Sequence, residues 1–169
     1  DLTEPRLLWI QPFESTLHIG GAGDQCETVG TRDGNTCTLT TDVIGEVAID
    51  ADDQVLDCDG HSILQSPQWP GSGVGVLVSW KSGITIRNCS IGAVGQTYGT
   101  GVLAFHATQV IVSGSDFEQN DTAIAFLSTT QCTATDNVIG MGTRNGVALN
   151  DDCLENEVSN NSIVIDPAG

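Results

Sequence analysis

Apolar residues fall two positions apart in short runs along most of this chain, as in Ile84-Thr85-Ile86 and Val110-Ile111-Val112. Alternation of this kind predicts short β-strands with one buried face. No run has the three-to-four-residue spacing of an amphipathic helix, and Gly, Ser, Thr and Asn are abundant between the runs. We therefore expect many short strands joined by tight turns and no long helix.

A Gly-apolar signature recurs along the second half of the chain. It reads Gly75-Val76-Leu77-Val78, Gly101-Val102-Leu103-Ala104, Ala123-Ile124-Ala125-Phe126 and Gly146-Val147-Ala148-Leu149, at intervals of 26, 22 and 23 residues. A second signature places a small or polar residue two positions before an apolar one, at intervals of 26, 22 and 24 residues. Its members are Cys89 with Ile91, Ser115 with Phe117, Asn137 with Ile139 and Asn161 with Ile163. Two markers that advance at nearly the same irregular pace indicate a solenoid.

Three short strands per repeat can share one interior when coils stack on one another. We predict an all-β parallel β-helix of about five coils over residues 37–169, each coil adding about 4.8 Å. Residues 1–36 lack the repeat and are expected to cap or flank the first coil. The residues of the second signature, Cys89 to Asn161, should form a column at a turn. There, Asn side chains would hydrogen-bond along the stack and tolerate a left-handed backbone.

The six cysteines are an even number without a CxxC pair, which favours disulfides and an oxidising compartment over a zinc site. Aligning Leu56 with Ile86 places Cys58 one coil away from Cys89. One layer of about 4.8 Å lies within the Cα separation that a disulfide spans. We predict a bridge between Cys58 and Cys89.

The other four cysteines form two pairs by position. Cys26 and Cys37 are close in sequence, so a local bridge is expected between them. Cys132 and Cys153 fall on successive predicted coils and are expected to form the third bridge. The alternative is that buried cysteines are free and serve as small core residues.

The segment Leu56-Asp57-Cys58-Asp59-Gly60-His61-Ser62-Ile63 leads into Ile84-Thr85-Ile86-Arg87-Asn88-Cys89-Ser90-Ile91. Together they resemble the entry coil and first regular coil of the right-handed parallel β-helix superfamily, over about residues 37–165. The resemblance implies a right-handed solenoid, a fold shared with pectate-lyase-like enzymes, alginate epimerases and periplasmic β-helix proteins. It says little about activity, because one fold hosts unrelated functions.

The chain is strongly acidic, with 22 Asp and Glu against 5 Lys and Arg and a formal net charge of −17. This charge repels nucleic acid and anionic membranes. No apolar stretch approaches a membrane span, and Asp1 opens into a polar segment without a signal-peptide pattern, so any signal peptide is expected to have been removed. With the cysteines, these features predict a secreted, extracellular protein without membrane insertion.

Candidate chemistry is sparse. Asp50, Asp52, Asp53, Asp57 and Asp59 could hold calcium, although strand alternation and the lack of a calcium-loop spacing favour a solvated acidic face. We therefore expect no cofactor and no resident metal.

The run Asn150-Asp151-Asp152-Cys153 resembles the paired-aspartate segment of polygalacturonases, but the Gly-His-Gly and Arg-Ile-Lys segments of that family are missing. The cationic and histidine residues needed for lyase or epimerase chemistry are scattered along the chain. We therefore assign no catalytic residue.

Two kinds of surface residue remain. Trp69, in a Pro-rich turn, and Trp80 are candidate contacts for a glycan or a protein partner. Asn88, Asn120 and Asn160 begin glycosylation sequons, of which Asn120, between predicted strands, is expected to be the most accessible.

The last segment, residues 163–169, follows an apolar strand without a helix to cover it. We therefore predict a non-catalytic structural solenoid that self-associates or binds protein partners through its coil edges or faces, forming an extracellular complex or filament. The alternatives are a carbohydrate-active enzyme, namely a lyase, hydrolase or epimerase, and a glycan-binding module.

Overall fold

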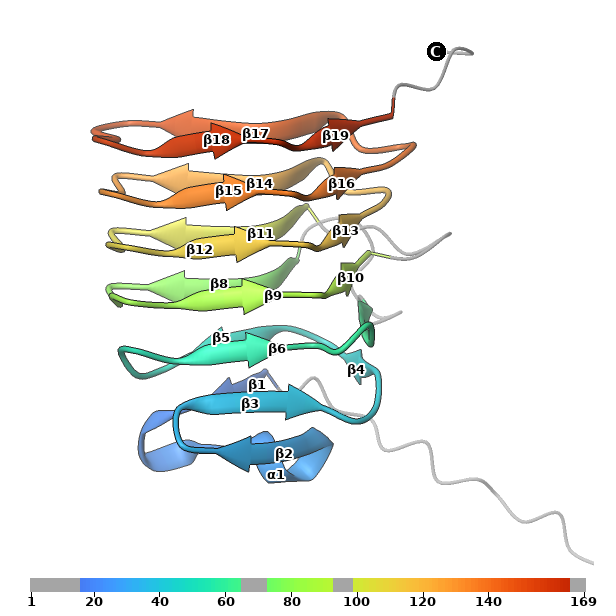
Figure 1. Ribbon diagram of the computed structural model, residues 1–169, viewed down its shortest axis with the longest axis vertical. Coiled ribbons are helices and arrows are strands. Elements are labelled where there is room, and N and C mark those ends of the chain that lie inside the picture. Colours follow the sequence, from blue (N-terminus) through green and yellow to red (C-terminus); the bar gives the residue numbers. More distant parts are fainter. Residues whose placement is uncertain (1–15, 65–72, 93–98, 165–169) are drawn as a thin grey trace, which may run out of the picture.

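The computed structural model describes residues 16–64, 73–92 and 99–164, which form a stack of coils (Figure 1). Three sheets run along the stack, and every strand pair in them is parallel except β2 with β3. The first sheet contains β1 (Leu17–Ile19), β5 (Val47–Ile49), β8 (Val74–Ser79), β11 (Thr100–Phe105), β14 (Thr122–Leu127) and β17 (Asn145–Asn150).

The other two sheets complete each coil. The second contains β2 (Gly30–Asp33), β3 (Thr36–Leu39), β6 (Val55–Asp57), β9 (Thr85–Arg87), β12 (Ile111–Ser113), β15 (Thr133–Thr135) and β18 (Glu157–Ser159). The third contains β4 (Val43–Ile44), β7 (Ser62–Leu64), β10 (Ser90–Ile91), β13 (Asp116–Phe117), β16 (Val138–Ile139) and β19 (Ser162–Ile163). The prediction of an all-β parallel β-helix is confirmed.

The coils from β8 to β19 number four and repeat regularly, and the strands from β1 to β7 add less regular levels at the N-terminal end. Part of the expected cap, β1, is itself a solenoid strand paired with β5. The rest of the described cap contains the 3₁₀ helix η1 (Gly21–Gly23), the short helix α1 (Cys26–Val29) and β2. In Figure 1, α1 and β2 lie below β3, at the N-terminal end of the stack.

The two sequence signatures stack in register. Val76, Val102, Ile124 and Val147 pair across β8, β11, β14 and β17. The first three are fully buried in the interior. Glycine is required at position 101 of this signature because a larger residue would clash. A Cβ there would lie 2.6 Å from the carbonyl oxygen of Ala123 and 2.7 Å from the ring of Phe117.

The polar column forms as expected. The backbone N–H groups of Cys89, Ser115 and Asn137 donate to the side-chain oxygens of Ser115, Asn137 and Asn161, at 3.1, 3.1 and 3.0 Å. The left-handed residues of this turn are not the column itself. They stand one position earlier, at Asn88, Gly114, Asp136 and Asn160, with φ between 55° and 57°.

Candidate functional site

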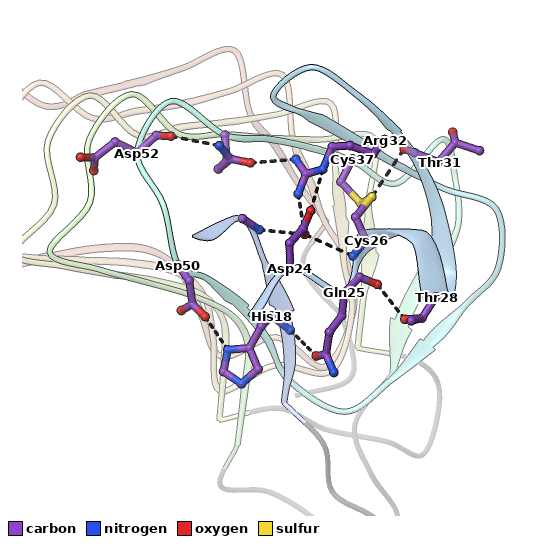
Figure 2. Close-up of polar contacts among 12 residues, drawn as sticks. His18, Asp24, Gln25, Cys26, Thr28, Thr31, Arg32, Cys37, Asp50 and Asp52 are labelled. Atoms are coloured by element: carbon purple, nitrogen blue, oxygen red, sulfur yellow. Dashed lines mark hydrogen bonds and ion pairs between the residues drawn. A yellow bond between two sulfur atoms is a disulfide. The ribbon is translucent and has the colours of Figure 1, made fainter. Parts of the chain in front are cut away.

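An ion pair at the N-terminal end of the stack holds the cap together (Figure 2). The Arg32 Nε donates to Asp24 Oδ2 at 3.0 Å, and the Arg32 Nη1 donates to Gln54 Oε1 at 2.8 Å. The backbone N–H groups of Gly20 and Cys26 donate to Asp24 Oδ1. Burial alone would raise the pKa of Asp24, but Arg32 and the two backbone donors outweigh it and hold the pKa below its usual range.

This cluster closes the N-terminal end of the core. Interior residues of the first strands, such as Ile19, Cys37 and Leu39, are buried. The edge strand of the second sheet is β2, which runs antiparallel to β3. Asp24 and Arg32 were not singled out from the sequence, although Asp33-Gly34 between two Thr-containing runs is a hairpin signal. The polar groups of the cluster bind one another, which indicates a structural role.

The coil made of β17, β18 and β19, here called the open coil, ends the described stack at the opposite end (Figure 1). Each of its strands is the last strand of its sheet within the described residues. Leu149, Val158 and Ile163 align with Phe126, Ala134 and Ile139 of the coil below. Those three are buried, whereas Leu149, Val158 and Ile163 are 47, 47 and 61 % exposed. The open coil therefore presents interior positions to solvent.

A second network joins β6 to β9 beside the disulfide between Cys58 and Cys89. Asp57 accepts hydrogen bonds from Arg87 Nε at 2.8 Å, Asn88 Nδ2 at 3.0 Å and the backbone N–H of Asp59 at 3.0 Å. Burial alone would raise the pKa of Asp57, but these donors and the charge of Arg87 outweigh it and hold the pKa below its usual range.

The lowered pKa makes a pH-dependent prediction for Asp57→Asn. A carboxylate with a lower pKa in the folded state stabilises that state above the unfolded pKa, and the contribution is lost as the pH falls toward the folded pKa. We expect Asp57→Asn to lower the unfolding free energy by about 1 kcal/mol at neutral pH. The difference from wild type should shrink below about pH 4, as measured by urea unfolding. A difference that stays constant down to about pH 3 would contradict it.

A family of known proteins matches this architecture. The family described as the right-handed beta helix region matches residues 34–169. The chain belongs to this family. No curated protein and no solved structure matches the chain. Membership of this family confirms the right-handed β-helix fold. It does not determine the activity, because proteins with this fold have unrelated functions.

Two of the three predicted disulfides are present in this right-handed β-helix. Cys26 bonds Cys37 with a Cα separation of 5.7 Å, and Cys58 bonds Cys89 with a Cα separation of 4.8 Å. Disulfides are typical of proteins that fold in an oxidising compartment.

The predicted bridge between Cys132 and Cys153 is wrong, because both residues are free. The coils pair Thr133 with Glu157 and Thr130 with Leu154, so Cys153 lies three positions before the register partner of Cys132. Burial raises the pKa of the Cys132 thiol, which makes it a weak nucleophile. Cys132 is therefore a free, buried cysteine that serves as a small core residue, which was the alternative to a third disulfide.

The accessibility of the sequons is the reverse of the expectation. Asn120 is buried, and its Nδ2, the atom that a glycan would occupy, donates to the carbonyl oxygens of Ile91 and Glu118 at 3.1 and 3.2 Å. Asn88 and Asn160 are exposed and lie at left-handed positions, and the Nδ2 of Asn88 donates to Asp57 Oδ1 at 3.0 Å. Asn120 is therefore a structural residue of the folded coil.

The acidic residues singled out from the sequence do not converge. Asp50 contacts His18 Nδ1 at 2.5 Å, and Asp52 accepts the backbone N–H of Ser82 at 2.9 Å. Within the described residues, no three His, Cys, Asp or Glu side chains are gathered as metal ligands. Asp151 and Asp152 are exposed at a turn of the open coil.

The aromatic candidates divide between described and undescribed residues. Trp80 is 67 % exposed and stacks on His106. Trp69 lies outside the described residues. In the described ranges, no helix has the length and hydropathy needed to cross a bilayer.

Proposed function

We propose that this right-handed β-helix is a secreted, non-catalytic structural module that assembles through its open coil. The observation that carries the proposal is the exposure of Leu149, Val158 and Ile163, which occupy interior positions. Exposed apolar residues beside unpaired strand edges are a template for adding further strands. A coil placed on β17, β18 and β19 would continue the core and the three sheets.

The partner that best fits is a second copy, joined open coil to open coil. The N-terminal end of the stack is covered by α1 and by β2, which runs antiparallel to β3 and forms the edge of the second sheet. In a head-to-tail stack, β18 of one copy would therefore meet an edge strand of the wrong direction in the next copy. Identical surfaces that meet across a two-fold axis give a closed pair rather than a filament. Of the assemblies expected from the sequence, a closed complex therefore fits this solenoid better than a filament.

A structural role also agrees with how the charged side chains are used. The arginines of the described residues, Arg32, Arg87 and Arg144, each form an ion pair with an aspartate. A lyase or epimerase needs such cations for its substrate. The two disulfides support secretion. Among the sequons we propose glycosylation at exposed Asn160, because the Nδ2 of Asn88 donates to Asp57.

The test is the mass of the chain in solution, measured by light scattering over a range of concentrations. We expect a concentration-dependent mass of twice one chain. Pairing should strengthen with added salt, because the open coil carries Glu155, Glu157 and Asp151 and the two copies repel. A monomer at the highest concentration reached, or open-ended filaments, would contradict the proposal.

A matched pair of variants locates the interface. Val158→Glu places a charge in the apolar end of the open coil and is expected to abolish pairing. Ile111→Glu makes the same kind of change at a similarly exposed residue of β12, away from the open coil. It should leave pairing unchanged. If both variants dissociate the pair, or neither does, the open coil is not the interface.

A further inference from the structure

Three aromatic side chains form a corner of the solenoid where β8 and β11 end, here called the aromatic corner. It consists of Trp80, Phe105 and His106. The indole of Trp80 stacks on the imidazole of His106, with ring centroids 4.2 Å apart and planes 21° apart. Phe105 meets both rings edge-on. One face of the indole is thus covered by His106.

The backbone of Trp80 is left-handed, with a φ of 56°. The same turn of the later coils is left-handed at His106, Ser128 and Asp151, with φ of 48°, 52° and 58°. A turn of this shape is adopted most readily by Gly, Asn or Asp, and a bulky residue there is strained. The Trp80 side chain is also 67 % exposed, so core packing does not explain it. An exposed tryptophan at a strained position points to a contact with a partner.

Carboxylates lie beside this corner on the preceding coil. Asp50 follows Ile49, which pairs with Val78 two residues before Trp80. Asp52 accepts the backbone N–H of Ser82, and Asp53 has a backbone N–H that donates to the Ser82 carbonyl oxygen. All three aspartates are exposed.

The charges beside the aromatic corner select the kind of partner. Lys81 follows Trp80 and is a neighbouring cation. The carboxylates of Asp52 and Asp53 are available to a basic partner, whereas Asp50 is paired with His18. The chain as a whole carries −17 and attracts positively charged partners over distance. Tryptophan is the side chain that binds cations best through its ring face.

We propose that the aromatic corner binds a basic peptide segment of another protein. An arginine or lysine of that segment lies on the face of the Trp80 indole that His106 leaves uncovered. Asp52 and Asp53 attract the neighbouring basic residues. The site lies on the side of the stack and is separate from the open coil, so it would function in a single copy as well as in a pair.

Trp80→Asn tests the site without endangering the fold, because asparagine tolerates the left-handed backbone. Asparagine before Lys81 and Ser82 also creates a glycosylation sequon, so all proteins are produced in the bacterial periplasm, which forms disulfides and adds no glycan there. The probe is a fluorescein-labelled hexa-arginine peptide, titrated with the full chain at low salt and followed by fluorescence anisotropy. We expect Trp80→Asn to raise the Kd about five- to tenfold and to leave the thermal midpoint equal to or above that of wild type.

A charge-matched pair of double variants separates this site from general attraction. Asp52→Asn with Asp53→Asn should raise the Kd about threefold at low salt. Asp116→Asn with Asp136→Asn removes the same charge elsewhere on the solenoid, and Asp136 shares the φ of 56° found at Asp53. The control should bind like wild type.

Three results would overturn the proposal. Equal weakening by both double variants would show non-specific attraction of a polycation. An unchanged Kd for Trp80→Asn would show that the indole is not used. Neutral oligosaccharides that bind wild type but not Trp80→Asn, with no peptide binding by either, would show that the corner takes sugars instead. All three readouts are independent of whether two copies pair.

Discussion

Asn137→Ala is expected to lower the unfolding free energy by about 2–4 kcal/mol, because it leaves buried backbone groups without partners. Asn137 is buried, and its Oδ1 accepts the backbone N–H of Ser115 at 3.1 Å. Its Nδ2 donates to the carbonyl oxygen of Val112 at 3.0 Å and to Asn161 Oδ1 at 2.9 Å. One side chain thus connects three successive coils.

Asn137→Ser is the matched comparison in urea unfolding. Ser115 already holds this place one coil below, where its Oγ accepts the backbone N–H of Cys89 at 3.1 Å. Serine at position 137 can accept the Ser115 N–H in the same way and should recover part of the loss. Equal losses for alanine and serine would show that the column contributes through packing rather than through hydrogen bonds.

The regular coils could be predicted from the sequence because each coil repeats the same local rules. Interior apolar residues such as Val102 and Ile124, and column residues such as Ser115 and Asn137, recur at matching intervals and fall in register. The alignment of Leu56 with Ile86, which predicted the bridge between Cys58 and Cys89, is also present in the structure.

The third bridge was predicted wrongly because Cys132 and Cys153 are 21 residues apart, whereas the register between their coils requires 24. The turn of the open coil is also one residue longer than the turn below it. Leu127 and Thr130 are paired with Asn150 and Leu154, so three steps along the chain in one coil correspond to four in the next. This added residue accounts for one of the three positions by which Cys153 misses the register partner of Cys132. The other two follow from the repeat interval of 23 residues, which already exceeds the 21 residues between the two cysteines. A repeat fixes the residues that carry it and leaves the turns between them free to vary.

The candidate sites were harder to predict because they depend on neighbours distant in sequence. Asn120 looked accessible between two strands, yet its Nδ2 bonds to Ile91, which is 29 positions away. The aromatic corner exists because Trp80 and His106 occupy the same turn of successive coils. Trp80 itself was a candidate from composition, whereas its stacking and backbone conformation required the structure.

The disulfide between Cys58 and Cys89 is expected to contribute more stability than the one between Cys26 and Cys37. In the chain-entropy account, the sequence separations of 31 and 11 correspond to about 3.7 and about 2.8 kcal/mol. Cys58→Ala with Cys89→Ala should therefore lower the unfolding free energy by about 3–4 kcal/mol, measured by urea unfolding without reductant.

The bridge between Cys58 and Cys89 also fixes the first regular coil to the less regular coil below, where Asp57 already holds Arg87 and Asn88. Cys153→Ala, which removes a partly exposed free thiol, is the control and should cost less than about 1 kcal/mol. Adding reductant should destabilise wild type more than the Cys58/Cys89 double variant, because the variant retains only the bridge that closes the shorter loop. If reductant destabilises both proteins equally, the longer loop contributes nothing and the chain-entropy account is wrong for this solenoid.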